Sequence, residues 1–133
     1  YWEARKEFSF GVPTGTMAEC IERALKLDTK PVVISDSGDN PTGGGTGDRA
    51  DALAELLRMK ATSAVVAGIA DRPATEACYK AGVGQTLPLK IGGTLDPASS
   101  KPIDVTAKVL FLAKTPRLPE RQAVVQIEGV TLG

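Results

Sequence analysis

The stretch Asp39-Asn40-Pro41-Thr42-Gly43-Gly44-Gly45-Thr46-Gly47-Asp48 decides how this chain is interpreted. It joins an apolar run, residues 31–34, to an amphipathic helical pattern that begins at Asp48. A strand, a glycine-rich turn and a helix start in this order bring backbone N–H groups and the positive end of a helix dipole to one small volume. We therefore expect a binding loop. The residues expected to contact a substrate are Asp36, Asp39, Asn40, Gly43, Gly44, Gly45 and Asp48.

The loop does not fit the common phosphate-binding motifs. A Walker loop requires a lysine after its last glycine, and no lysine occurs between Lys30 and Lys60. The dinucleotide motif Gly-x-Gly-x-x-Gly would begin at Gly43 and Gly45, but Asp48 occupies the position of its third glycine. The loop therefore does not predict nucleotide binding.

Calcium binding is disfavoured as well, whereas a purely structural turn stays open. The available oxygens, on Asp36, Asp39, Asn40 and Asp48, do not follow the EF-hand order and lack a final bidentate glutamate. In a structural turn, Asp39 and Asn40 would form an Asx-turn, the glycines would adopt positive φ, and Asp48 would cap the next helix. A loop with these features can also bind a ligand.

Hydrophobic periodicity predicts an α/β fold. Helices are expected at about residues 16–27, 48–60 and 71–81, and strands at 31–35, 63–69, 86–91, 103–112 and 123–128. The first two strands flank a helix, which predicts a βαβ unit with parallel strands and 31–35 at the centre of the sheet. The later strands follow one another without helices, which predicts an antiparallel strand meander. The whole is expected to be a three-layer mixed sheet.

Residues at the helix ends support two of the three helices. Thr16 and Glu19 have the spacing of a capping box before the first helix. Asp71 is expected to cap the third helix, with Pro73 in its first turn and Gly82 directly after its end. These residues predict where the first and third helices begin and where the third helix ends.

Polar residues and glycines at strand ends are further candidates. Asp36 and Asp71 follow the ends of two predicted strands, and ligands of open α/β sheets bind outside the carboxyl ends of the strands. We expect both carboxylates beside the glycine-rich loop, although capping is the favoured role of Asp71. Gly92 and Gly93 indicate either a second point of close approach or a turn.

Composition is typical of one domain of a cytoplasmic protein. The 133 residues, 42% of them hydrophobic, can bury one core, so a single domain is expected over 1–133. Sixteen basic and sixteen acidic residues balance, and no apolar run approaches the roughly 20 residues that span a bilayer, so neither nucleic acid nor membrane is an expected partner. Cys20 and Cys78 are expected to be free thiols in a reducing compartment, with a single disulfide between them as the less favoured alternative.

Residues 32–48 resemble the C-terminal domain of the MlrC-like (microcystinase C) metallopeptidases. Members of that family carry a hydrophobic strand, an Asp-x-x-Asp-Asn-Pro-x-Gly-Gly-Gly loop, a small-residue stretch and an Asp that opens a helix. The resemblance continues along nearly the whole chain, through Trp2 and Arg5, the turn at 81–84, and residues 91–97.

This resemblance implies a function for the longer protein. MlrC-like proteins look like two-domain zinc hydrolases in which histidines and carboxylates of a larger N-terminal domain bind the metal. This chain has no histidine, so it is not expected to ligate zinc, to supply catalytic residues or to be active alone. It is expected to complete the cleft for a peptide-like substrate, with the N-terminal domain as its partner. The alternative is a non-catalytic module that binds an anion or assists domain assembly.

Overall fold

The computed structural model describes the backbone of residues 1–115 and 118–133 and the side chains of residues 1–113 and 121–133. These residues divide into two compact units, the N-terminal unit of residues 1–34 and the C-terminal unit of residues 35–133. Each unit has its own secondary structure, and each is described by itself. Whether residues 1–133 form one domain of the longer protein stays a prediction.

The N-terminal unit consists of a short 3-10 helix, η1 (Glu3–Lys6), and one α-helix, α1 (Met17–Lys26). The predicted capping box is confirmed, because the Glu19 N–H donates to Thr16 Oγ1 at 3.3 Å and the Thr16 N–H donates to Glu19 Oε2 at 2.8 Å. Residues 31–35, the predicted central strand, belong to no strand, and none of their backbone groups is hydrogen-bonded to another described residue. That strand prediction is wrong, since an apolar run specifies burial but not which sheet provides it.

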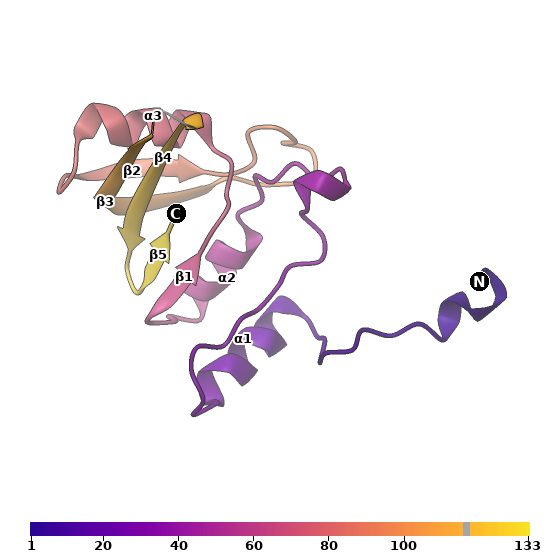
Figure 1. The fold of residues 1–133 in the computed structure, drawn as a ribbon. Coiled ribbons are helices and arrows are strands. Elements are labelled where there is room, and N and C mark those ends of the chain that lie inside the picture. Colours follow the sequence, from indigo (N-terminus) through magenta and orange to yellow (C-terminus); the bar gives the residue numbers. More distant parts are fainter. Residues whose placement is uncertain (116–117) are drawn as a thin grey trace. The chain divides into compact units, whose positions relative to one another are not determined.

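The C-terminal unit is built on a five-stranded mixed sheet (Figure 1). Its elements are η2 (Pro41–Gly43), α2 (Asp51–Arg58), β1 (Ala64–Val66), α3 (Arg72–Ala81), β2 (Thr86–Ile91), β3 (Ile103–Thr115), β4 (Leu118–Ile127) and β5 (Val130–Leu132). The strand order is β1-β5-β4-β3-β2, with β1 parallel to β5 and the other neighbours antiparallel. The predicted α/β fold with a mixed sheet and an antiparallel meander is confirmed. The parallel partner of β1 is β5, however, and not residues 31–35 as the βαβ prediction required.

Register places the hydrophobic core on one face of this sheet. Val109 pairs with Val125, and Val125 pairs with Leu132, so the three side chains share a face, and all three are buried. Leu53 of α2 and Cys78 of α3 belong to the same buried cluster. Both helices therefore cover one face, which gives two layers in the described residues where three were expected.

Candidate functional site

The glycine-rich loop is held in shape mainly by its own hydrogen bonds. Asn40 Oδ1 accepts the Thr42 N–H at 3.0 Å and the Thr42 hydroxyl at 2.7 Å, which confirms an Asx-turn at Asn40. The Asn40 carbonyl accepts the N–H groups of Gly43 at 2.9 Å and Gly45 at 2.8 Å. Gly44 ends the turn at φ 95°. The Gly44 N–H donates to the Pro41 carbonyl at 3.2 Å, so the N–H groups of Gly43, Gly44 and Gly45, which were expected as donors to a ligand, are already engaged within the loop.

Asp39 closes the loop onto the residues that follow it. Its Oδ1 accepts the Gly47 N–H at 2.7 Å and the Thr46 hydroxyl at 3.4 Å, and its Oδ2 accepts the Arg49 N–H at 3.0 Å. The backbone N–H groups of Arg49 and Gly47 stabilise the carboxylate and hold the pKa of Asp39 below its usual range. Asp39 is therefore an ionised anchor, and its hydrogen bonds hold the loop in shape.

Asp48 lies at the centre of a buried network and does not cap α2. Its side chain is 0% exposed, and its Oδ2 accepts the Leu95 N–H at 2.7 Å and the Thr94 hydroxyl at 3.4 Å. The N-cap of α2 is Ala50, which makes no side-chain capping bond. The predicted cap is wrong because the carboxylate turns toward residues 94–95 and satisfies donors there instead.

The protonation of Asp48 is decided by these donors. Burial opposes ionisation, but the nearby Thr46 hydroxyl and the hydrogen bonds from Leu95 and Thr94 outweigh it and lower the pKa of Asp48. Its Oδ1 has no hydrogen-bond partner among the described residues, because the Thr46 hydroxyl donates to Asp39 instead. Asp48 is therefore a buried anion that neutral donors compensate only in part.

Gly92 and Gly93 join the loop to the end of β2. The Gly93 N–H donates to the Asp48 carbonyl at 3.0 Å, and the Gly92 N–H donates to Asp71 Oδ2 at 2.8 Å. Gly92 has φ 80°, and a Cβ there would lie 2.6 Å from the Asp48 carbonyl oxygen. The backbone approaches Asp48 closely at the turn that follows β2, so the two interpretations from sequence apply together, and no other residue fits at Gly92.

Asp71 has both of the roles that its position suggests. Its Oδ1 accepts the Ala74 N–H at 2.9 Å, which confirms the predicted cap of α3, while its Oδ2 binds Gly92. The neighbouring Ala70 N–H donates to the Gly47 carbonyl at 2.7 Å. The glycine-rich loop, the start of α3 and the turn after β2 therefore form one hydrogen-bonded assembly.

The remaining predicted site residues lie on the outside of this assembly. Asn40, Gly43 and Gly44 are exposed, and among the described residues nothing accepts a hydrogen bond from Asn40 Nδ2. Asp36 is also exposed, and its carboxylate binds only the nearby Gly38 N–H, at 2.7 Å. The structure thus brings Asp39 and Asp48 together, places the Asn40 amide at the surface, and does not tie Asp36 to the loop.

Basic side chains beside this assembly are paired with their helical neighbours. Arg49 Nε lies 2.7 Å from Asp51 Oδ2, and this hydrogen bond and charge raise the pKa of Arg49. Arg72 Nε lies 2.8 Å from Glu76 Oε1 on the exposed side of α3. Neither arginine forms an ion pair with Asp39, Asp48 or Asp71 in the described part of the chain, so those carboxylates depend on N–H and hydroxyl donors.

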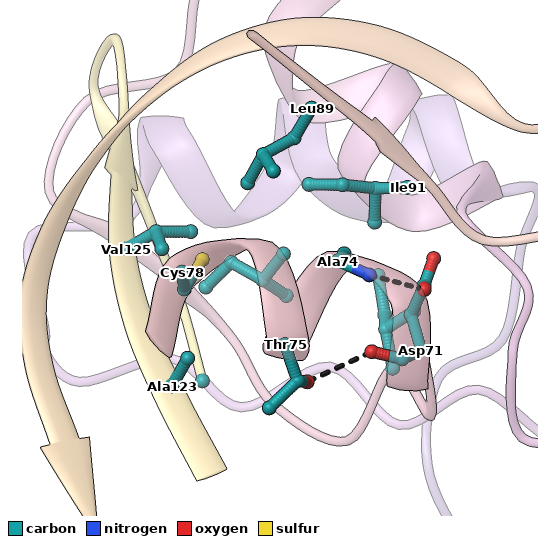
Figure 2. A pocket seen from close by; sticks show the side chains of 11 residues that line it. Asp71, Ala74, Thr75, Cys78, Leu89, Ile91, Ala123 and Val125 are labelled. Atoms are coloured by element: carbon teal, nitrogen blue, oxygen red, sulfur yellow. Dashed lines mark hydrogen bonds between the residues drawn. The ribbon is translucent and has the colours of Figure 1, made fainter. Parts of the chain in front are cut away.

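A small cavity lies between α3 and the sheet, separate from the exposed loop residues (Figure 2). It measures about 40 Å³, and its lining includes Asp71, Thr75 and Cys78 of the α3 region facing Leu89 and Ile91 of β2. Burial raises the pKa of the Cys78 thiol. This volume accommodates water-sized molecules and is far below the size of a substrate pocket, so the cavity is a packing feature of the core.

The described residues offer no credible metal site of their own. No group of three or more histidine, cysteine, aspartate or glutamate side chains is placed to hold a metal ion in residues 1–113 and 121–133. The donor set of these described residues therefore does not fit a zinc ion. In the same part of the chain, no helix has the length and apolar character needed to cross a bilayer.

Sequence reasoning missed the partners of Asp48. Thr94 and Leu95 are separated from it by 46 and 47 positions, and no local pattern links such distant residues. The pair of glycines at 92–93 was the one available signal, since adjacent glycines indicate where two backbones come close. β5 was also missed, because three residues are too few to show a periodicity.

Comparisons with known proteins agree with this fold. The model of the family described as MlrC C-terminus matches residues 34–132. Microcystinase C of Sphingomonas sp. is 33% identical over 102 residues, which are 77% of this chain and 20% of that protein. A crystal structure of a candidate metallopeptidase from Mesorhizobium sp. BNC1 has a TM-score of 0.79 at 22% identity, covering 98% of this chain and 28% of its own. The chain thus spans about a fifth of the length of its curated relative. By its family match, the chain belongs to the MlrC C-terminal family.

Proposed function

We propose that this chain is the C-terminal domain of a zinc-dependent peptidase or amidohydrolase of MlrC type that acts on peptide-like substrates. The metal and the catalytic residues belong to an N-terminal domain of the same polypeptide, in the cytoplasm, and this chain alone is inactive. Family membership supports the proposed type of enzyme. The free thiols of Cys20 and Cys78 support the proposed cytoplasmic location. The role of this chain is to bind and orient the substrate with its glycine-rich loop.

The observation that carries this role is the fixed, exposed amide of Asn40. Thr42 holds Oδ1 with two hydrogen bonds, so the position of Nδ2 is set before any ligand arrives. A preorganised donor loses little conformational freedom on binding a carbonyl or carboxylate oxygen. Asn40 is therefore the residue that we propose contacts the substrate.

The other site residues have supporting roles in this proposal. Gly43, Gly44 and Gly45 keep side chains away from the approaching substrate, and Asp39 and Asp48 hold the loop in position. Asp36 lies at the rim, where its exposed carboxylate can meet a basic group of the substrate. Among the predicted site residues, which all lie in the described part of the chain, Asn40 and Asp36 are the exposed ones whose side chains present free polar atoms to the outside.

The test uses the longer, zinc-loaded protein and an isosteric substitution. Asn40→Asp keeps the oxygen that accepts from Thr42 but replaces the Nδ2 donor, so it separates substrate contact from loop shape. We expect kcat/KM for short peptides to fall about tenfold or more at unchanged zinc content. The matched control is Gln85→Glu, which makes the same chemical change at an exposed residue outside the loop and leaves the rate unchanged.

A second candidate function, an anion-binding or domain-assembly module, is favoured by the internal bonding of the loop. Most of its N–H groups already have partners within residues 39–49, as expected of a structural element. This function predicts equal rates for wild type and Asn40→Asp. It also predicts that Asp39→Ala, which removes the anchor of the loop, weakens the association of the two domains or the binding of inorganic phosphate.

A further inference from the structure

The N-terminal unit exposes most of its apolar side chains. Ile21 is the one buried residue in 1–34, whereas Val33 is 87% exposed and Phe10 is 69% exposed. The other exposed apolar side chains of this unit are Tyr1, Trp2, Phe8, Val12, Leu25, Leu27 and Ile34. An accumulation of this kind marks a surface that another protein segment covers.

Residues 31–35 have the properties of an unpaired strand. They belong to no helix or strand, the first four of them are apolar, and none of their backbone N–H or carbonyl groups is bonded to a described residue. A row of free backbone groups beside apolar side chains is a template for pairing with the edge of a sheet. A run that is apolar on both sides is typical of a strand in a parallel sheet whose two faces are covered.

α1 precedes this segment as a helix precedes a strand in α/β domains. It is capped at Thr16, and its apolar residues, Met17, Ile21, Ala24 and Leu25, recur at helical spacing. Of these four residues, Ile21 alone is fully buried, at 2% exposure. A helix with one apolar face followed directly by an apolar strand is the repeating element of a parallel α/β sheet.

Two independent boundaries place this helix and the first residues of this strand before the family domain. The family match begins at residue 34, and the compact C-terminal unit begins at residue 35. The chain corresponds to about a fifth of microcystinase C, so a protein of that length has ample sequence for another domain. α1 and residues 31–33 therefore lie outside the domain that the family match defines, and residues 34–35 lie at its first positions.

We infer that α1 and residues 31–35 are a helix and a strand of the neighbouring α/β domain of the longer polypeptide. Residues 31–35 pair with an edge strand of that domain's sheet, and α1 packs on the sheet's face through Ile21 and Leu25. The inference rests on the proposed presence of that domain, not on what it catalyses. The glycine-rich loop, which starts at Asp39, then follows the carboxyl end of a strand in the partner sheet, where α/β domains bind ligands.

Hydrogen exchange of the longer polypeptide and of the 133-residue chain tests this inference without any activity measurement. The amides of residues 32–35 should exchange about tenfold or more slowly in the longer protein than in the 133-residue chain. Equal rates in both proteins would overturn the inference, because no strand would then form. Slow exchange already in the 133-residue chain would overturn it too, because the strand would then pair within this chain, for example with the open edge of β1.

A matched pair of substitutions tests whether residues 31–35 are buried in the longer protein. Val33→Asp should leave the melting temperature of the 133-residue chain unchanged but should lower that of the longer protein and abolish the slow exchange of residues 32–35. Val83→Asp, at a residue that is 59% exposed in the C-terminal unit, should do neither. Equal effects of the two substitutions in the longer protein would contradict a buried strand at 31–35.

Discussion

The two units of this chain have similar sequence patterns but opposite degrees of burial. In the C-terminal unit, Leu53 is 0% exposed and Val109 is 0% exposed, whereas in the N-terminal unit Leu25 is 47% exposed and Val33 is 87% exposed. Both units contain an amphipathic helix followed by an apolar run. A hydrophobic pattern thus indicates that a segment must be buried, and tertiary context decides where.

The largest expected effect contrasts one leucine from each unit. Leu53→Ala removes a fully buried side chain of α2 and should cost about 2–5 kcal/mol of the free energy of unfolding of the C-terminal unit. Leu25→Ala, in α1, should cost less than about 1 kcal/mol in this chain. Urea denaturation of both variants measures the difference, and similar losses would show that the N-terminal unit has a core of comparable strength.

The second prediction concerns the point where loop and sheet meet. Gly92→Ala places a Cβ 2.6 Å from the Asp48 carbonyl oxygen and 2.8 Å from Ala50 Cβ, and should cost about 3 kcal/mol or more. Gly84→Ala is the control, because Gly84 has a similar φ, 86° against 80°, but a Cβ there meets nothing within 4 Å. It should cost about 1 kcal/mol, the strain of the backbone alone. Equal losses in thermal unfolding would disprove the close approach.

The third prediction uses pH to probe the carboxylates of Asp39 and Asp48, which accept backbone N–H groups. The pKa values of Asp39 and Asp48 are lowered in the folded protein, so their stabilisation is complete above the unfolded value of 3.8 and is lost as pH falls through the folded values. The melting temperature of the C-terminal unit should therefore decrease below about pH 4. Asp48→Asn should flatten this dependence, whereas Asp104→Asn, at an exposed residue of β3, should leave it unchanged.

The smallest expected effect concerns the N-terminal unit alone. Thr16→Ala removes the capping box of α1 and should destabilise that helix by about 1 kcal/mol. Hydrogen exchange should then be faster in α1 and unchanged in the sheet. A change in the exchange of β3 and β4 would show that the two units unfold together.

The sequence predicts the elements better than it predicts their partners. Local signals suffice for Thr16 and Asp71, because each caps a helix through an N–H three residues along the chain. The strand of residues 86–91 is predicted with its observed bounds, since turn residues flank it. The prediction that residues 31–35 form the central strand of this sheet is wrong for the opposite reason, because a strand also needs a partner, and the partner is not encoded locally.

Local sequence likewise predicts some features of the candidate site and not others. The glycine-rich loop and its Asx-turn follow from residue type, because Asn40 and Thr42 are two positions apart. The direction of the Asp48 side chain does not follow, since the same residue type at the same position could cap α2 or bind residues 94–95. Long-range hydrogen bonds compete with local capping, and spacing alone does not decide between them.

The central claim is that residues 35–133 form the family domain and its loop without residues 1–34. The direct measurement is a comparison of amide NMR spectra of residues 35–133 and of the whole chain. The signals of Gly47, Arg49 and Gly92, whose N–H groups bind carboxylates, should coincide in the two spectra. Loss or displacement of these signals in the shorter protein would contradict the claim, because the loop would then depend on the N-terminal unit.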